Sequence, residues 1–259
     1  MIPQAYITEW RNKAPWAENY QVEQDLVIER ALAEIYADDF LKTRLAFRGG
    51  TALHKLHLSP QARYSEDIDL VQVSSEPFGP IIDRLRERLQ WLGKPAIKQK
   101  HFNNTMVFRF DSEDNIPIKL KVETNCREHF TVMGIIEMKF KVESAWFTGE
   151  VNIPTYDIHE LLGTKLRALY QRKKGRDLFD LWYAMTSKEL DAEKIIAIWK
   201  RYMDEEDQKV SQAEFLQNME EKIGDPDFLG DMKGLLRPEI HYDIEKAYAF
   251  VKKKLLEKI

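Results

Sequence analysis

The stretch "FRGGTALHKLHLSPQARYSEDIDLVQV", residues 47–73, places a glycine pair, a polar loop and two carboxylates in one short segment. "LAFRGG" is a short apolar run that ends at two glycines, and "TALHKLHL" after it fits a short helix. "EDIDLVQV" alternates and is rich in strand-forming residues, which predicts a β-strand. The order therefore predicts a strand-to-helix turn followed by an acidic strand.

Asp67 and Asp69 share one face of that strand, because successive side chains of a strand point to opposite sides. Ile68 and Leu70 then face the core. Two carboxylates on one face repel each other, and a divalent cation beside them keeps both ionised. Mg²⁺, or Mn²⁺ in its place, fits best, since Mg²⁺ accepts one or two carboxylates and completes its octahedron with water and phosphate oxygens.

Gly49 and Gly50 leave the backbone bare at the turn, where a phosphate can approach N–H groups at the start of the following helix. Thr51 adds a hydroxyl. Together with the acidic strand, these residues indicate a site for an anion and a metal. The alternative is a tight turn followed by an exposed strand with two solvated acids.

A third carboxylate is available at Glu123. "PIKLKVETN", residues 117–125, alternates so that Lys119, Lys121 and Glu123 share one face. Glu123 could act as a metal ligand or as the base for an attacking hydroxyl. The alternative is an edge strand with a charged outer face.

The order of elements predicts an α+β protein with a mixed β-sheet flanked by helices, followed by a helical C-terminal domain. Residues 23–44 and 79–92 have helical periodicity. Strands are expected at residues 96–102, 105–112, 117–124, 137–144 and 146–156. We place the first domain at residues 1–153 and the second, which contributes to the site, at 154–259. Helices are expected there at residues 157–173, 175–187, 191–203, 211–223 and 241–259, with "GDPDFLGD" as one of the polar joints.

The second domain opens at a capping-box spacing, with Asp157 as the N-cap and Glu160 three positions later. Lys165 and Arg172 are seven residues apart on this helix and so share a face. A cation at that position could neutralise a triphosphate.

The next helix carries Asp177 and Asp180 three residues apart, hence as neighbours. Asp180 could orient Lys165 or an acceptor. The alternative is a salt bridge between helices, with Arg176 or Arg167 as the partner of Asp180.

The composition sets bounds on function. The 39 basic and 43 acidic residues give a net charge of −4, which argues against bulk electrostatic binding of nucleic acid but leaves room for a local basic patch. The single cysteine, Cys126, excludes an internal disulfide. No secretion signal or membrane-spanning segment is recognisable, so we expect a cytoplasmic protein with no membrane partner.

The segments "GGTALHK", "RYSEDIDL" and "KLRALYQRKKGRDLFDLW" resemble the AbiEii/AbiGii-type nucleotidyltransferase toxins, which include the MenT toxins, of type IV toxin-antitoxin and phage abortive-infection systems. The resemblance covers residues from about 45 to 185. These toxins belong to the polymerase-beta-like nucleotidyltransferase superfamily, whose signature is a glycine pair, a spacer and an acid-hydrophobic-acid strand.

The resemblance assigns roles to single residues. It places Gly49, Gly50 and Thr51 at the nucleotide phosphates and makes Asp67 and Asp69 metal ligands, with Glu123 as the third acid. Lys165 falls on an active-site lysine of the family, and Asp180 on the aspartate of the "RDxxDL" segment. The sequence departs from the superfamily pattern in its longer spacer and in having Thr51 where serine is more common, and neither change removes a functional group.

The implied activity is Mg²⁺-dependent transfer of a nucleoside monophosphate from a nucleoside triphosphate (NTP) to RNA, with the tRNA 3′ end as the expected acceptor. Arrested growth and a cognate antitoxin protein are further implications. Basic residues could guide the acceptor, namely Lys165, Arg167, Arg172, Lys173, Lys174 and Arg176. One alternative is modification of a small molecule such as an aminoglycoside, with an acidic pocket around "MDEED". Another is an inactive nucleotide-binding regulator, which would tolerate loss of Glu123.

Overall fold

The computed structural model of the protein describes residues 2–100 and 102–259. These residues divide into two compact units after Tyr156. The boundary predicted after residue 153 falls inside the last strand of the first unit, where Pro154 pairs with Glu137 and Thr155 pairs with Phe47. The strand thus continues for three residues past the predicted boundary.

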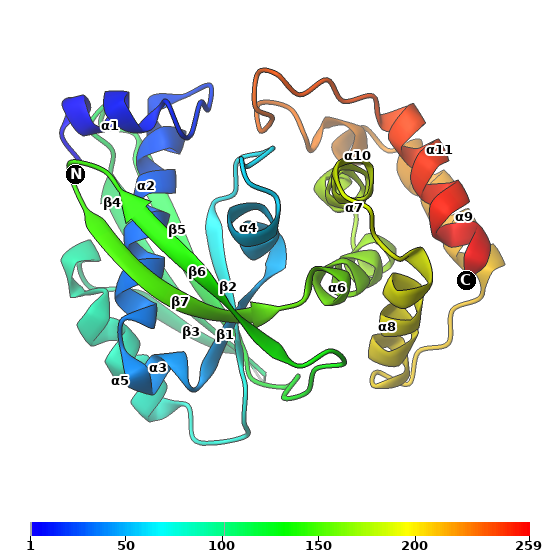
Figure 1. Cartoon of the computed structure of the whole chain (residues 1–259), viewed down its shortest axis with the longest axis horizontal. Helices are drawn as coiled ribbons and strands as arrows, with labels where there is room; N and C mark the ends of the chain where they lie inside the picture. The colour runs from blue at the N-terminus through cyan, green and yellow to red at the C-terminus, as the bar shows by residue number, and fades with distance from the viewer. Residues whose placement is uncertain (1, 101) are drawn as a thin grey trace. The chain divides into compact units, whose positions relative to one another are not determined.

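The first unit is built on a seven-stranded mixed sheet in the order β3-β4-β5-β2-β1-β7-β6 (Figure 1). The strands are β1 (Leu45–Arg48), β2 (Asp67–Gln72), β3 (Ala96–Lys100), β4 (Asn103–Asp111), β5 (Pro117–Asn125), β6 (Ile135–Glu143) and β7 (Thr148–Tyr156). β2 pairs in parallel with β5, and β1 in parallel with β7, whereas the other neighbours are antiparallel. The predicted α+β class with a mixed sheet is confirmed.

The strand positions agree with the alternating pattern to within a few residues at each end. His101, which belongs to the predicted strand 96–102, lies outside the described residues. One alternative is wrong: β5 is not an edge strand, because β4 and β2 flank it on its two sides. The charged face of β5 therefore lies within the sheet and beside the acidic strand β2.

The helices of the first unit surround this sheet. They are α1 (Gln4–Trp10), α2 (Asn19–Tyr36), α3 (Asp39–Lys42), α4 (Gly49–Ala52), a π-helical turn η1 (Leu53–His57), α5 (Gly79–Arg88) and a 3₁₀ turn η2 (Gln90–Leu92). The helix predicted over residues 23–44 is in fact two helices. Asp38 interrupts it, because its side chain accepts hydrogen bonds from the backbone N–H groups of Phe40 and Leu41 and so starts α3.

A buried ion network joins η1 to α2. Lys55 Nζ lies 3.0 Å from Asp25 Oδ2, 2.6 Å from Glu29 Oε1 and 3.1 Å from Gln61 Oε1. Only 1% of the Lys55 side chain is exposed. Burial alone lowers the pKa of Lys55, but the two carboxylates outweigh it and raise that pKa above its usual value. The network therefore holds a charged lysine where the segment after the glycine pair packs on α2.

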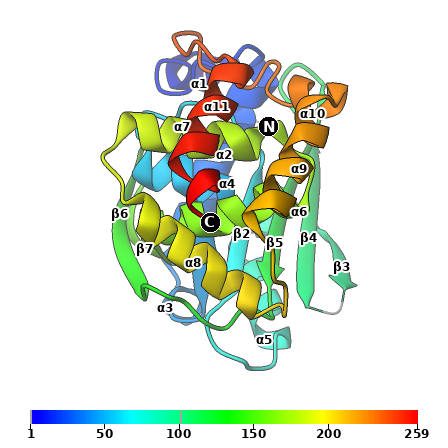
Figure 2. The ribbon, with the colours of Figure 1, turned by 90° about the vertical axis from the view of Figure 1, so that its right-hand side faces the viewer.

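The second unit is helical (Figure 2). Its elements are α6 (Ile158–Gln171), α7 (Gly175–Ser187), α8 (Ala192–Asp204), α9 (Gln212–Ile223), α10 (Pro226–Gly230), α11 (Ile244–Lys254) and a 3₁₀ turn η3 (Leu256–Lys258). α6 packs closely on α8, since a Cβ added to Gly163 would lie 2.6 Å from Ile198 Cγ2.

Two details of the second unit differ from the prediction. The segment "GDPDFLGD" contains a short helix, α10, because the Asp225 side chain accepts from the N–H groups of Asp227 and Phe228 and Phe228 is buried. At the start of α6, Asp157 is the N-cap, as predicted, and accepts from the His159 N–H. The second difference concerns Glu160, which the sequence placed in a capping box at the start of this helix. Glu160 is buried, and its carboxylate accepts a hydrogen bond from the Tyr202 hydroxyl.

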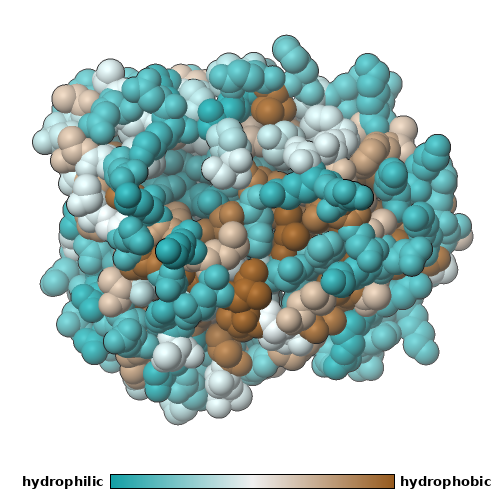
Figure 3. All heavy atoms as spheres, viewed as in Figure 1, coloured by the Kyte–Doolittle hydropathy of each residue, from teal (hydrophilic) through white to brown (hydrophobic). Residues whose placement is uncertain are grey.

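The surface agrees with a composition in which 32% of residues are charged. Hydrophilic residues cover most of the face seen in Figure 3. Among the described residues, none of the helices combines the length and apolar character needed to cross a membrane.

Replacing Lys55 by Met tests the buried network. The change leaves Asp25 and Glu29 buried without their cation, so the free energy of unfolding falls by about 3–5 kcal/mol. Glu34→Gln, which breaks the partly exposed Arg30–Glu34 pair on α2, is the matched control and costs about 0.5 kcal/mol. Urea denaturation measures both, and equal losses would contradict the role given to Lys55.

Candidate functional site

Asp67 and Asp69 lie on one face of β2 and are both half-buried, while Ile68 and Leu70 are buried on the other face. Asp67 Oδ1 is buried and has no hydrogen-bond partner among the described residues. A buried carboxylate oxygen without a partner is costly unless a ligand satisfies it. The acidic strand thus presents an oxygen that is available to a ligand.

Gly49 packs directly against Asp69. Its φ of +79° is unfavourable for residues with a side chain, and a Cβ at this position would lie 2.2 Å from Asp69 Oδ2. β1 and β2 are antiparallel with Arg48 opposite Asp69, so the chain that leaves β1 must pass this carboxylate. Gly50 follows as the second residue of α4. The turn after β1 therefore needs glycine for two independent reasons.

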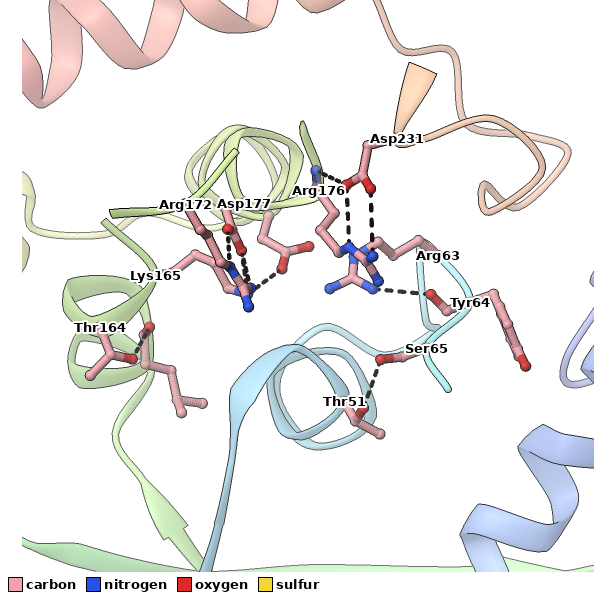
Figure 4. A network of polar contacts seen from close by, with 12 residues as sticks. Thr51, Arg63, Tyr64, Ser65, Thr164, Lys165, Arg172, Arg176, Asp177 and Asp231 are labelled. Carbon is pink, nitrogen blue, oxygen red and sulfur yellow. Dashed lines mark hydrogen bonds and ion pairs between the residues drawn. The ribbon is translucent and has the colours of Figure 1, made fainter. Parts of the chain in front are cut away.

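Thr51 is buried and fixes the start of β2. Its hydroxyl donates to the Asp67 carbonyl at 2.6 Å and lies 2.7 Å from Ser65 Oγ (Figure 4). The Thr51 hydroxyl, which we expected at a phosphate, thus donates a hydrogen bond to the backbone of Asp67. In this position Thr51 couples the glycine turn to the acidic strand.

Glu123 joins the two aspartates through the pairing of β2 with β5. The register places Asp69 beside Glu123 and Asp67 beside Lys121, so the four side chains share one face of the sheet. Glu123 Oε1 accepts a hydrogen bond from Thr105 Oγ1 at 3.4 Å on the neighbouring strand β4. The structure therefore brings the three predicted acids together.

Lys121 is the cation of this patch. Its Nζ lies 3.0 Å from Asp67 Oδ2, and the side chain is 31% exposed. Burial lowers the pKa of Lys121, but the hydrogen bond to Asp67 and the charge of that carboxylate outweigh it, so the pKa is raised. Lys121 is therefore a cation at neutral pH.

Arg48 adds a second cation near Asp69. Its Nη1 lies 2.5 Å from Glu128 Oε2. Burial lowers the pKa of Arg48, and the acidic groups around it, chiefly Glu128 with a smaller contribution from Asp69, raise it overall. Arg48 therefore adds a positive charge near the acids of β2.

The second unit contains a buried cluster of its own (Figure 4). Lys165 Nζ lies 3.0 Å from Asp177 Oδ1 and 3.0 Å from Asp180 Oδ2, and neither aspartate side chain is exposed. Arg172 binds Asp177 through two hydrogen bonds of 2.7 and 2.8 Å. The face shared by Lys165 and Arg172 therefore meets the pair of aspartates on α7.

Asp177 is held as a carboxylate. Burial raises its pKa, but Lys165 and Arg172 outweigh this and lower the pKa below its usual value. Arg176 and Arg167, considered above as partners of Asp180, form salt bridges with Asp231 and Glu206 respectively. The aspartate pair and Lys165 thus form one fixed electrostatic unit.

The basic connection between α6 and α7 is matched by acids of the same unit. The six basic residues that were candidates for guiding RNA all form ion pairs with five carboxylates. The pairs are Lys165 with Asp177 and Asp180, Arg167 with Glu206, Arg172 with Asp177, Lys173 with Asp225, and both Lys174 and Arg176 with Asp231. Little net positive charge remains in this cluster.

Comparison with known proteins identifies the family. The sequence model described as "Nucleotidyl transferase AbiEii toxin, Type IV TA system" matches residues 30–250, which is most of the chain. The chain belongs to this family. Comparison with the sequences of curated proteins gave no match.

Two solved structures share the fold of this AbiEii-family protein. The MenT4 nucleotidyltransferase toxin from Mycobacterium tuberculosis H37Rv is 16% identical, with a TM-score of 0.67 over 100% of this chain and 91% of that one. A "putative nucleotidyltransferase" from H. pylori is 19% identical, with a TM-score of 0.55 over 93% of this chain and 98% of that one. At these identities the likeness concerns the fold alone.

A nucleotidyltransferase of this family implies a divalent metal, and the acids of β2 fit one. Within residues 2–100 and 102–259, no group of three or more His, Cys, Asp or Glu side chains lies close enough together to hold a metal ion. The donor set nevertheless suits a hard cation, because Asp67 Oδ1 is unpartnered and two further carboxylates share its face.

Three residues of these clusters received no role from the sequence. Arg48 lies inside "FRGG", Lys121 alternates with Glu123, and Asp177 precedes Asp180 by three positions. The Lys-x-Glu spacing and the three-residue spacing of the aspartates were visible signals, since each places two side chains on one face. No local pattern announced the pairing of Arg48 with Glu128, which is 80 residues away.

Gly49→Ala tests the close approach to Asp69. We expect it to lower the free energy of unfolding by about 1–2 kcal/mol from the left-handed backbone and by a further amount of about 1–3 kcal/mol from the contact with Asp69. Gly134→Ala is the control, because Gly134 has φ +83° but no atom within 4 Å of an added Cβ. If urea denaturation finds equal losses, the contact with Asp69 is not a constraint.

Asp177→Asn tests the buried cluster through pH. A carboxylate with a lowered pKa stabilises the fold above its unfolded pKa of about 3.9, and this stabilisation is lost as the pH falls through the folded pKa. At pH 7 the variant therefore loses about 3–5 kcal/mol, and the difference from wild type narrows below about pH 4. Glu205→Gln, in the more exposed Arg201–Glu205 pair, serves as the control in a pH series of urea titrations. A difference that stays constant down to pH 2 would contradict the assignment.

Proposed function

We propose that this protein is a metal-dependent nucleotidyltransferase toxin that transfers a nucleoside monophosphate from an NTP to the 3′ end of an RNA, with tRNA as the acceptor. One observation carries the proposal. Asp67, Asp69 and Glu123 share one face of the sheet next to the Gly49 turn, in a chain that belongs to the AbiEii toxin family.

Asp67 and Asp69 are the residues that would hold Mg²⁺ or Mn²⁺, with Glu123 beside them. When bound, the metal supplies positive charge that stabilises the phosphoryl oxygens in the transition state. The unpartnered Oδ1 of Asp67 supports this assignment, as does Lys121, whose charge already offsets part of the repulsion between the carboxylates.

The transfer makes one bond and breaks one. The oxygen of the acceptor hydroxyl bonds to the α-phosphorus in line, the bond from that phosphorus to the bridging oxygen breaks, and pyrophosphate leaves. The hydroxyl proton passes to a carboxylate, and Glu123 is the candidate base. The donor phosphates belong at Gly49, Gly50 and Thr51 by family resemblance, and the packing of Gly49 against Asp69 puts this turn next to the acids of β2.

Lys165 and Asp180 are part of the proposal by the same resemblance. The geometry within the second unit gives them support, because the 3.0 Å contact fixes the lysine ammonium against Asp180. Asp177 takes the other side of Lys165 and so acts as a positioning residue for it.

Modification of an aminoglycoside receives less support. That alternative needs an acidic pocket around "MDEED", residues 203–207. Glu206 of this segment instead accepts from Arg167 at 3.2 Å and from Gln171 at 2.6 Å, so its charge is already matched.

A toxin requires control. The family description, a type IV toxin-antitoxin system, implies a cognate antitoxin protein as a partner. Transfer to tRNA would block translation, arrest growth and so limit phage propagation, and it would place the protein in the cytoplasm, where its acceptor is found.

Transfer of labelled nucleotide tests the proposal. The protein is incubated with Mg²⁺, total tRNA and each of the four α-labelled NTPs in turn. We expect label on tRNA with wild type, and a loss of about a hundredfold or more in Asp69→Asn, since a metal ligand contributes several kcal/mol to the transition state. Asp83→Asn, on the exposed surface of α5, is the matched control.

Binding of Mn²⁺, followed by electron paramagnetic resonance, gives a readout that does not depend on transfer. Asp69→Asn should weaken it and Asp83→Asn should not. Mn²⁺ and NTP binding without transfer to any RNA would overturn the proposal. In that case the remaining possibilities are an enzyme that modifies a small molecule and an inactive nucleotide-binding regulator. Glu123→Gln distinguishes them, because a regulator keeps its nucleotide binding in this variant and has no transfer activity to lose.

A further inference from the structure

A small pocket lies in the first unit where β2 and β5 begin. Its volume is about 220 Å³. It is lined by residues of α2, β2, β5 and the residues next to them, namely Tyr20, Gln24, Glu66, Asp67, Pro117, Ile118, Lys119 and Lys121. Asp67 and Lys121 therefore belong to both the pocket and the acidic patch.

The pocket and the glycine turn lie on different sides of β2. β1, which leads into Gly49, is one neighbour of β2, and β5, which carries Lys119 and Lys121, is the other. The acids of β2 lie between the glycine turn and the pocket. A transfer reaction has two substrates, a donor and an acceptor, and each needs a binding place next to these acids. With the donor phosphates at the glycine turn, the pocket on the β5 side is left for the acceptor.

Hydrogen bonds from the Gln24 side chain hold the wall of the pocket in place. Gln24 donates from Nε2 to the Glu66 carbonyl at 2.8 Å and to the Lys119 carbonyl at 3.3 Å. Its Oε1 accepts from the buried Tyr64 hydroxyl at 2.8 Å. One amide thus fixes the backbone on both sides of the opening, so the shape of the pocket does not depend on a ligand.

The lining indicates the chemistry of the occupant. Tyr20 offers a ring on which a base can stack, and Glu66 offers a carboxylate to sugar hydroxyls. Lys119 and Lys121 provide two ammonium groups, which suit a phosphate. The volume lies below the roughly 300–1,000 Å³ of pockets that enclose a drug-sized ligand, so the pocket holds a part of the acceptor.

We propose that this pocket is the acceptor subsite: it holds the terminal nucleoside of an RNA strand beside Asp67, with Lys119 and Lys121 on its phosphate. The inference rests on the proposed function. It adds the residues that select a nucleic acid and identifies Lys119, which does not touch the acids, as a specificity residue.

Lys119→Gln is the main test, because this lysine is exposed and its removal leaves Asp67 and Lys121 in place. Binding of fluorescently labelled total tRNA is followed by anisotropy over a series of salt concentrations. We expect binding to weaken severalfold and the slope of log K against log salt to become shallower by about 0.7, the value for one phosphate contact of a single strand. Lys139→Gln on β6, at the far edge of the same sheet, is the matched control and should change neither quantity.

Kinetics separate the subsite from the donor site. In Lys119→Gln the KM for tRNA should rise while the KM for the NTP stays unchanged. Tyr20→Leu should weaken tRNA binding by about tenfold if a base stacks on the ring, again without loss of NTP binding.

Each other outcome is decisive. If wild type transfers nucleotide to tRNA but Lys119→Gln and Lys139→Gln behave alike, the subsite is wrong and the proposed function stands. If Lys119→Gln weakens NTP binding as much as tRNA binding, the pocket serves the donor and the inference is overturned. If wild type neither binds nor modifies RNA, the proposed function fails and the inference fails with it.

Discussion

The close packing of the Gly49 backbone against the Asp69 carboxylate is the constraint on which the site depends. β1 runs antiparallel to β2 with Arg48 opposite Asp69, so the residue after Arg48 must cross the acid that the strand presents. Only a residue without Cβ fits there. Once β2 is held in this way, its parallel pairing with β5 sets Glu123 beside Asp69 and Lys121 beside Asp67. The turn, the acids and their cation are thus consequences of one register.

Each unit contains a pair of aspartates, and the two pairs differ in how far they are buried. The pair of the second unit forms a fixed cluster, whereas the pair of the first unit is open to ligands. Asp177 and Asp180 have no exposed side-chain surface, and their partner Lys165 is only 7% exposed, so removing that cation would leave buried charges uncompensated. Asp67 is 24% exposed and its partner Lys121 is 31% exposed. Water can replace Lys121 at modest cost, so Asp67 can exchange one cation for another. The acids of β2 are therefore the pair that fits the proposed exchangeable metal.

Alternation along the strands predicted most of the first unit, because side-chain direction in a strand depends on local geometry alone. It set Asp67 and Asp69 on one face. Whether β5 was an edge or a central strand depended on its distant neighbours, β2 and β4, which no local pattern reveals. The break at Asp38 and the helix α10 were missed for another reason. Both depend on an aspartate that caps a short helix, a signal weaker than the periodicity around it.

The net charge of −4 argues against bulk attraction to RNA. The structure adds how the basic residues are distributed. The basic residues around α6 and α7 are matched by carboxylates, whereas Lys119 and Lys121 line a pocket next to the proposed chemistry. A protein that neutralises few phosphates gains little from counterion release, so under the proposed function most of the affinity for RNA would come from the nucleoside in the proposed acceptor subsite. The proposal thus concentrates recognition at the end of the acceptor strand, which is also where the proposed transfer to a 3′ hydroxyl takes place.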